Sequence, residues 1–232
     1  MSSIKFNELT PKKVLGVAAH PDDLDFGASG SMAKWAKSGA EVYYLILTDG
    51  SKGSDDINIT PEALVEIRQN EQRTAAQAIG AKDVIFFNYP DAYLEVTLEL
   101  KKDITRIIRK LKPDVVITMD PNLIYDSTRG FINHSDHRAA GQATLDAVFP
   151  MARDRLTFPD LLEDGYEPHK VPTLLLVNFT HGNYFEDITD TIDAKMSALA
   201  AHDSQMDDVP GTQNRLKQMA KDNGEKLSLI HI

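Results

Sequence analysis

The 232-residue chain contains no cysteine. This absence excludes disulfide bonds, thiolate ligands for zinc and cysteine nucleophiles, so any bound metal ion must be held by histidine, aspartate or glutamate. Long apolar runs are absent too, because no stretch approaches the roughly 18 residues that span a bilayer. The opening MSSIKFNELT lacks the apolar segment of a secretory signal. We therefore expect a cytoplasmic protein with no membrane span.

Positive charge is scarce relative to negative charge. The chain has 25 lysine and arginine residues against 35 aspartate and glutamate residues, which gives a formal net charge of -10 at pH 7. An acidic surface repels phosphate backbones, and the basic residues are scattered along the sequence. Nucleic acid is therefore not an expected partner. The length and the apolar fraction of 42% are those of one ordinary globular domain, which we place at residues 1–232.

Motifs that cradle phosphates or carry a nucleophilic serine are missing as well. Neither G-x-x-x-x-G-K-[ST] nor G-x-S-x-G occurs, which argues against P-loop nucleotide hydrolysis and against a serine hydrolase. Only Gly27 and Gly30 are present where a dinucleotide-binding protein has G-x-G-x-x-G. They follow Asp22 and Asp23, which would repel a pyrophosphate, so a nicotinamide or flavin cofactor is not expected.

What the chain does have is a regular alternation of apolar runs and amphipathic segments. The runs predict buried strands, and the segments between them have helical spacing with capping residues. Strands that are apolar throughout are typical of a parallel sheet covered on both faces. We therefore predict an α/β fold, a Rossmann-like three-layer αβα sandwich with a mostly parallel sheet. The expected strands are 13–19, 41–48, 83–89, 114–119 and 173–179, and the expected helices are 30–38, 61–79, 98–111, 135–149 and 191–201.

Polar residues follow each of the five expected strands. In chain order these stretches are HPDD, DGSKG, PDAY, DPN and THGN. Ligands of parallel α/β sheets bind outside the carboxyl ends of the strands, so the polar stretches mark one edge as a candidate site. The polar, proline-bearing segment 151–171 is either a lid over that site or an excursion.

Two pairs of candidate metal ligands lie at this edge. His20 and Asp23 are three residues apart, and so are His134 and His137 within NHSDH. Two histidines and one carboxylate, with one position left open, are a recurring arrangement for catalytic zinc. The structural alternative is that Asp22 and Asp23 cap a helix and that the two later histidines are surface residues at a helix start.

Several ordered motifs resemble those of one family. AHPDD followed by DFGASG, and then NHSDHRAAG, resembles the LmbE-like or PIG-L family of zinc-dependent N-deacetylases, which act on N-acetylglucosaminyl compounds. The resemblance covers residues 11–205 and extends to LTDGSKG, EIRQNEQRTAAQAIGA and LKPDVVITMDP. It is specific for the family and much less so for the substrate.

The resemblance implies that His20, Asp23 and His137 bind the zinc ion and that Asp22 is the general base. Hydrolysis of an amide needs an activated water, a polarised carbonyl and a protonated leaving amine, and zinc serves the first two needs. Asp22 adjoins Asp23, so it is placed to reach the same water molecule. The open position and the adjacent base together fit hydrolysis.

The same resemblance gives His134 and Asp136 catalytic roles. His134 would stabilise the tetrahedral intermediate or protonate the leaving amine, and Asp136 would orient His134. The chain departs from the family at one point, because Leu24 stands where many members have glutamate. Asp25 follows one position later, so we expect the core chemistry to survive.

Three further residues are candidates for binding the substrate, each with a structural alternative. Asp49 contacts substrate or belongs to an ordinary turn. Arg68 binds sugar hydroxyls or forms a salt bridge on a solvated helix face. Asp91 closes the loop after the third strand, where a role in the site is favoured. Tyr44 is expected in the core, and the sequence indicates no role for His181, for His202 or for the KLSLIHI tail, which would be an edge strand or an interface.

The sequence thus predicts a hydrolase that removes the acetyl group from a small N-acetylated sugar or sugar conjugate. One zinc ion per chain, or another divalent metal, would be the cofactor, and a homo-oligomer is expected. A metallo-phosphoesterase is the second hypothesis, although paired metals would need more carboxylates than the two motifs provide. A Rossmann-like sugar-binding protein without catalysis is the third.

Overall fold

Five parallel strands form the central sheet. The computed structural model describes residues 9–127, 130–178 and 182–226. The strands lie in the order β3-β2-β1-β4-β7, and each neighbouring pair is parallel. Their bounds are Lys13–Ala18 for β1, Glu41–Thr48 for β2, Asp83–Tyr89 for β3, Val115–Met119 for β4 and Thr173–Val177 for β7.

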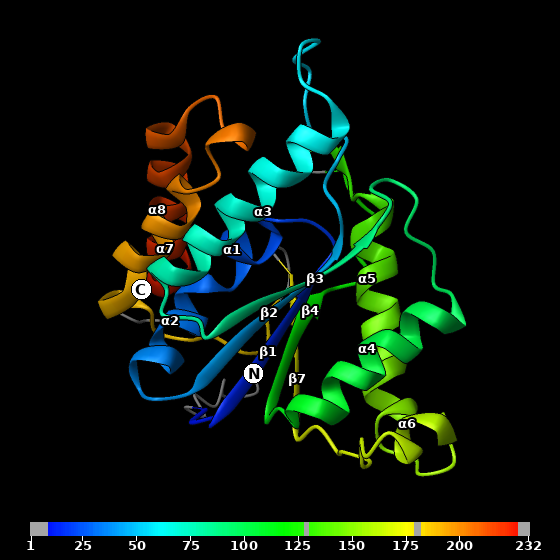
Figure 1. Ribbon diagram of the computed structural model, residues 1–232. Coiled ribbons are helices and arrows are strands. Elements are labelled where there is room, and N and C mark those ends of the chain that lie inside the picture. Colours follow the sequence, from blue (N-terminus) through cyan, green and yellow to red (C-terminus); the bar gives the residue numbers. More distant parts are fainter. Residues whose placement is uncertain (1–8, 128–129, 179–181, 227–232) are drawn as a thin grey trace.

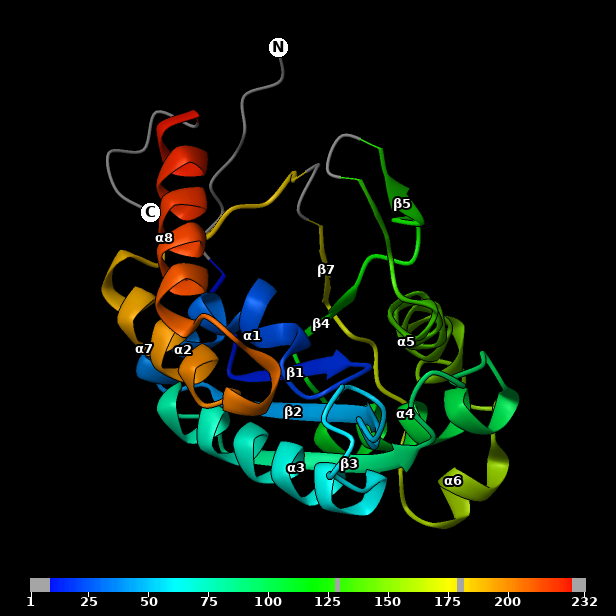
Figure 2. The same cartoon turned by 90° about the horizontal axis from the view of Figure 1, so that it is seen from above.

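Helices cover both faces of the sheet, with α4 and α5 on one face and α1, α2, α3 and α7 on the other (Figures 1 and 2). The C-terminal helix α8 packs on α7. This arrangement confirms the predicted three-layer α/β fold. The bounds are Asp23–Gly27 for α1, Ser29–Lys37 for α2, Pro61–Ala78 for α3, Leu98–Leu111 for α4, Ser135–Asp146 for α5, Ile192–Ala200 for α7 and Val209–Lys226 for α8.

Alternate side chains of β1 point to opposite faces of the sheet. Leu15 and Val17 belong to the hydrophobic cluster under α4 and α5, whereas Val14 and Ala18 belong to the cluster under α2 and α7. Both faces are buried, which is why the strand is apolar throughout rather than alternating with polar residues.

The order of the strands reverses beside β1, and this reversal positions the candidate site. The chain adds β2 and β3 on one side of β1 and then β4 and β7 on the other. The carboxyl ends of β1 and β4 therefore flank a crevice, which is where such sheets bind ligands. His20 follows β1 and Asp120 follows β4, so the polar stretches of the sequence meet at this edge.

Helix α5 lies directly against the end of β4. A Cβ atom at Gly141 would be 2.3 Å from the main-chain oxygen of Met119, an approach that only glycine allows. Because α5 begins at Ser135, this close packing brings its first turn, with His137, to the crevice.

The expected helix 135–149 is three residues too long. Helix α5 ends at Asp146, and a π-helical turn, Ala147–Met151, follows, in which Phe149 is extended with φ -144° and ψ 125°. The cause is Pro150, because proline disfavours helical conformation in the residue before it. The last strand was also expected to reach residue 179; β7 ends at Val177, and residue 179 lies outside the described residues.

Several short elements and one long helix were not expected from the sequence. Helix α1 begins inside the Asp-Asp stretch, and a two-stranded antiparallel hairpin precedes α5. None of the helices described is both long enough and apolar enough to cross a membrane. The unexpected elements are α1, α8, the hairpin strands Tyr125–Asp126 (β5) and Phe131–Ile132 (β6), and the helix Pro159–Glu163 (α6).

Segment 151–171 includes α6 and contacts the residues that precede β4, at the amino end of the sheet. His169 lies near the amino end of β4, where its Nε2 is 2.8 Å from the carbonyl oxygen of Pro113. The buried Arg109 of α4 holds the start of the segment by donating to four main-chain oxygens. These acceptors are Met151, Ala152, Asp154 and Thr157, at 2.8 to 3.2 Å.

We predict that Arg109→Met lowers the free energy of unfolding by about 3 kcal/mol or more, because several buried carbonyl groups lose their donor. Urea denaturation measures the change. Arg106→Met is the matched control, since Arg106 forms a partly exposed ion pair with Asp103 and such pairs contribute about 0–1 kcal/mol. Equal losses in the two variants would show that Arg109 does not anchor the segment.

Candidate metal centre

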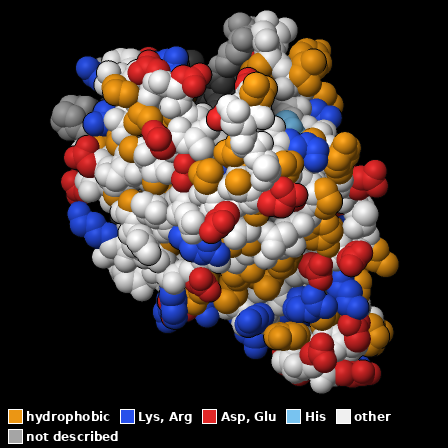
Figure 3. Space-filling view, turned by 45° about the horizontal axis from the view of Figure 1, so that its top comes forward, with side chains coloured by type: hydrophobic (Ala, Val, Ile, Leu, Met, Phe, Trp, Pro, Cys, Tyr) orange, Lys and Arg blue, Asp and Glu red, His pale blue; other side chains and the backbone are white. Residues whose placement is uncertain are grey.

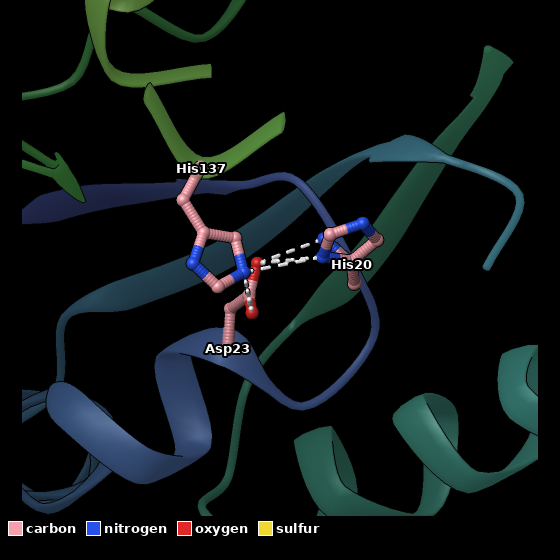
Figure 4. Close-up of side chains that lie close together, drawn as sticks. All are labelled: His20, Asp23 and His137. Atoms are coloured by element: carbon pink, nitrogen blue, oxygen red, sulfur yellow. Dashed lines mark hydrogen bonds and ion pairs between the residues drawn. The ribbon is translucent and has the colours of Figure 1, made fainter. Parts of the chain in front are cut away.

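Three side chains from two parts of the sequence converge in the crevice. Figure 4 shows His20, Asp23 and His137 pointing toward one another. Asp23 Oδ1 is 2.9 Å from His137 Nε2, and His20 Nδ1 is 3.3 Å from the same nitrogen. His20 Nδ1 is also 3.6 Å from Asp23 Oδ2. One donor atom from each residue lies within 4.8 Å of the others, so a single metal ion can be reached by all three.

The main chain fixes two of these side chains relative to each other. The N–H of His20 donates to Asp23 Oδ2 at 2.8 Å, so the tight turn after β1 presents the imidazole and the carboxylate together. His20 and Asp23, three residues apart, are therefore brought together by a turn and not by one face of a helix.

The outward nitrogen of His137 is also engaged. It is Nδ1, and it lies 3.0 Å from the side-chain oxygen of Asn133, whose amide nitrogen donates to the carbonyl oxygen of Leu123 at 2.7 Å. Because Asn133 presents its oxygen, His137 Nδ1 carries the proton and Nε2 keeps its lone pair for the centre. Metal-binding histidines are commonly oriented in this way. Nothing in the sequence singles out Asn133 except its place at the start of NHSDH.

The outward nitrogen of His20 faces two further carboxylates. His20 Nε2 lies 3.1 Å from Asp91 Oδ1 and 3.4 Å from Asp136 Oδ2. All three side chains are buried. Nδ1 is on the side of Asp23 and His137. When a metal ion takes the lone pair of Nδ1, the proton of the ring is on Nε2, next to the carboxylates of Asp91 and Asp136.

The centre concentrates negative charge away from water. Burial lowers the pKa of His20, but three close carboxylates outweigh burial and raise it to about 12. Burial raises the pKa of Asp23, yet His137 and His20 bring it well below its usual range. Buried carboxylates in this number need a positive partner. The donor set of two imidazoles and a carboxylate therefore suits a divalent metal such as zinc.

Asp22 occupies a constrained position beside the centre. Its backbone has φ 96°, a region that residues other than glycine rarely adopt. Asp22 is the N-cap residue of α1, but its side chain forms no capping hydrogen bond, so the carboxylate is not held by the helix. Burial and the nearby Asp23 raise the pKa of the Asp22 carboxyl to about 7. A carboxylate with a raised pKa is a stronger base than an ordinary aspartate.

Helix α3 supports Asp22 through two buried residues four positions apart. Gln72 accepts the N–H of Asp22 at 2.9 Å, and the guanidinium of Arg68 lies 3.5 Å from the Asp22 carboxylate. Arg68 also donates to the main-chain oxygens of Pro21 and Gly50, at 2.8 and 3.1 Å. Arg68 therefore does not lie on a solvated helix face, and its role as a substrate contact stays a prediction.

A buried network stands behind Gln72. The carboxylate of Asp25 accepts the hydroxyl of Tyr44 at 2.7 Å and the amide of Gln72 at 3.0 Å, and it lies 2.9 Å from His202 Nε2. All four side chains are buried. Because the Gln72 amide donates to Asp25, its oxygen faces Asp22. His202 thus has a structural partner that the sequence did not indicate, whereas His181 lies outside the described residues.

His134 occupies the N-cap position of α5. Its Nδ1 accepts the main-chain N–H of Asp136 at 3.1 Å, so the proton of the neutral ring is on Nε2. The side chain is 43% exposed, and burial together with the nearby His20 lowers its pKa. His134 is therefore a neutral imidazole that presents an N–H donor beside the centre.

The carboxylate of Asp136 points away from His134. It accepts the main-chain N–H groups of Ala92 and Leu94, at 2.7 and 3.3 Å, whereas its nearest approach to His134 Nδ1 is 3.9 Å. The sequence suggested that Asp136 orients His134. In the structure this orientation comes from the main-chain N–H of Asp136, and the carboxylate fixes the loop after β3.

The loops after β2 and β3 are joined through Asp49 and Asp91. Asp49 Oδ1 accepts the N–H groups of Ser51 and Asp91, at 3.0 and 3.1 Å, and Asp91 Oδ2 accepts the N–H of Lys52 at 2.9 Å. Both carboxylates thus have structural partners, and their roles as substrate contacts stay predictions. Asp91 also contacts His20, so its carboxylate belongs to the candidate metal centre as well as to the loop contacts.

A second set of donors overlaps the first. His20, Asp91 and His134 also offer atoms within 4.8 Å of one another. Both sets need His20, which would use Nδ1 in one and Nε2 in the other. A neutral imidazole has only one nitrogen lone pair free for coordination, so the two sets exclude each other. This overlap disfavours the paired metals that the phosphoesterase hypothesis requires.

The chain is similar to known deacetylases over most of its length. It matches the family model of PIG-L, described as GlcNAc-PI de-N-acetylase, over residues 15–148, more than half of its 232 residues. It is 35% identical over 200 residues to the diacetylchitobiose deacetylase of Thermococcus kodakarensis, covering 86% of this chain and 72% of that one.

Two further relatives are also named as deacetylases. The chain is 28% identical over 207 residues to a probable N-acetyl-alpha-D-glucosaminyl L-malate deacetylase of Bacillus anthracis, covering 84% of this chain and 81% of the other. The structure of N,N'-diacetylchitobiose deacetylase from Pyrococcus horikoshii superposes with a TM-score of 0.86 at 33% identity, covering 95% of this chain and 81% of that one.

We predict that Asn133→Ala weakens zinc binding about 10- to 100-fold, because His137 loses the acceptor that orients its ring. Competition with a chromogenic chelator measures the affinity. Asn122→Ala is the matched control, since the Asn122 side chain contacts Asp120 and none of the three candidate ligands. An unchanged affinity in Asn133→Ala would mean that the contact with His137 does not support the metal.

Proposed function

Because the chain belongs to the PIG-L family, it is a metal-dependent deacetylase of N-acetylglucosamine-type substrates, and we propose that His20, Asp23 and His137 hold one zinc ion per chain. The observation that carries this proposal is the convergence of three donor atoms, from the buried His20 and Asp23 and the half-buried His137, within 4.8 Å. The outward nitrogens of both histidines face oxygen atoms. The other two ring nitrogens, His20 Nδ1 and His137 Nε2, lie 3.3 Å apart.

A divalent metal bound there supplies Lewis acidity for the acetyl carbonyl and for the attacking water. The residues of the chain supply the proton transfers. We propose that the Asp22 carboxylate takes a proton from the water, since its raised pKa and its place next to Asp23 suit a general base. Arg68 and Gln72 hold this carboxylate and its main chain in position.

The carbonyl oxygen of the substrate is assigned to His134. Its side chain is partly exposed, and its Nδ1 is fixed by the start of α5, so Nε2 carries the N–H donor. A fixed N–H donor stabilises negative charge that develops on the carbonyl oxygen without reorganisation. When the bond between carbon and nitrogen breaks, the amine takes the proton that Asp22 removed from the water, and Asp22 returns to its carboxylate form. Acetate and a free amino sugar are the products.

Several features of the proposal rest on the sequence alone. Zinc, rather than another divalent metal, is favoured by the two imidazoles and one carboxylate. Sugar contacts by Asp49, Arg68 and Asp91 are proposed as additions to the structural contacts that these residues make. The single domain over residues 1–232, the homo-oligomeric state and the cytoplasmic location stay predictions.

We predict that purified protein binds one zinc ion per chain and that His137→Ala abolishes stoichiometric binding, because only two of the three donors remain. Atomic absorption after dialysis measures the content. His134→Ala is the informative comparison, because His134 belongs to the competing set of donors with His20 and Asp91. We expect it to keep the metal. If His134→Ala loses zinc and His137→Ala retains it, the metal belongs in the other set.

We predict that Asp22→Asn retains zinc but lowers the rate of acetate release about 10²- to 10⁴-fold, the usual effect of losing a general base. Asparagine keeps the shape of the side chain and removes its basicity. Asp55→Asn, at an exposed position of the loop after β2, is the matched control and should leave the rate unchanged. A rate near that of the unchanged protein in Asp22→Asn would contradict the assignment of the base.

A further inference from the structure

A mostly apolar cavity of about 350 Å³ opens beside the candidate metal centre. Asp23 and His137 form part of its wall, so the cavity is continuous with the centre. Most of the remaining wall is hydrophobic and comes from α1, the residues after β4, the hairpin and α8. We call this space the acyl cavity, and its main apolar residues are Phe26, Leu123, Phe131, Leu216 and Met219.

The polar residues of this wall already have partners within the protein. Asp120 accepts the main-chain and side-chain N–H groups of Asn122, at 2.9 and 3.1 Å, and the side chain of Asn178 at 2.7 Å. Asn133 is bonded to Leu123 and faces His137. A sugar ring placed here would bury hydroxyl groups with few partners, which is costly. The cavity therefore suits an apolar group.

The proposed catalytic residues decide which half of the substrate can face the cavity. Neither Asp22 nor His134 is part of its wall. The amine half of the amide must lie within hydrogen-bond reach of Asp22, which returns the proton taken from the water. The acyl half lies on the other side of the carbonyl carbon, toward Asp23 and His137. An acetyl group ends in one methyl group, which occupies only a small part of such a volume.

We propose that the acyl cavity binds the acyl group of the substrate and accepts linear acyl chains longer than acetyl. This inference rests on the proposed function, because it uses the roles of Asp22 and His134. The substrate class is thereby widened to N-acylated amino sugars. On the face shown in Figure 3, hydrophobic side chains are interspersed with acidic and basic ones.

The test compares N-acetyl-, N-butyryl- and N-hexanoyl-D-glucosamine as substrates. If the added methylene groups are buried in the cavity, kcat/KM rises about fourfold for each of them. Leu216→Trp places a large side chain in the cavity, and we expect the ratio of kcat/KM for hexanoyl over acetyl to fall at least tenfold. Asn214→Trp, at an exposed position of α8, is the matched control and should keep the ratio.

A binding measurement provides a readout that is independent of turnover. Calorimetry of the zinc-loaded protein should show tighter binding of hexanoate than of acetate, and Leu216→Trp should remove the difference. Circular dichroism checks the fold of this variant. If it is not folded, Met219→Phe serves as the second variant, because Met219 lines the same cavity.

The outcomes separate the two proposals. Release of acetate without any hydrolysis of the longer substrates, together with equal binding of hexanoate and acetate, overturns the acyl cavity and leaves the proposed function intact. If no amide of the series is hydrolysed, the proposed function fails, and hexanoate binding by the unchanged protein and by Leu216→Trp still decides whether the cavity takes an acyl chain. A ratio that Leu216→Trp does not change also overturns the assignment.

Discussion

The burial of negative charge around His20 is the constraint on which the centre depends. Asp23 begins α1, Asp91 lies in the loop after β3 and Asp136 lies in the first turn of α5, and all three are buried within reach of this one imidazole. Carboxylates removed from water repel one another unless a cation lies between them. A proton on His20 can meet this need only in part, whereas a divalent metal at Nδ1 meets it while Nε2 keeps its contact with Asp91. The start of α1, the loop after β3 and the start of α5 are therefore linked by charge as well as by packing.

The topology of the sheet explains why these loops meet. Strand β1 lies in the middle of the sheet. The chain adds β2 and β3 on one side of it and then β4 and β7 on the other. The loop after β1 consequently has neighbours on both sides, with the β2 and β3 loops on one and α5 on the other. The two sides differ in character. Asp49, Asp91 and Arg68 make the first side polar, whereas Phe131 and Leu216 make the second side apolar, so the amide bond of a substrate would lie across a boundary between them.

The fold could be predicted from the sequence because its strands are buried on both faces and read as continuous apolar runs. The spacing indicated two local pairs of candidate ligands, His20 with Asp23 and His134 with His137, and the resemblance to the family then selected His20, Asp23 and His137 as the predicted ligands. The supporting residues could not be found in this way. Asn133, Gln72 and His202 are ordinary polar residues whose roles depend on contacts across 4, 50 and 177 positions of the chain. Helix α8 was missed as well, although it supplies one wall of the acyl cavity.

At position 24 the chain has leucine where many members of the family have glutamate. Leu24 is buried in the cluster under α2, so close to β1 that a Cβ atom at Gly16 would lie 2.6 Å from its Cδ1 atom. A glutamate in this conformation would be buried among apolar side chains. The acid instead stands at Asp25, where Tyr44, Gln72 and His202 surround it. The side-chain oxygen of Gln72 in turn accepts the main-chain N–H of Asp22. The acidic residue, Asp25, thus stands one position later than the glutamate of many family members, and buried polar partners surround it there.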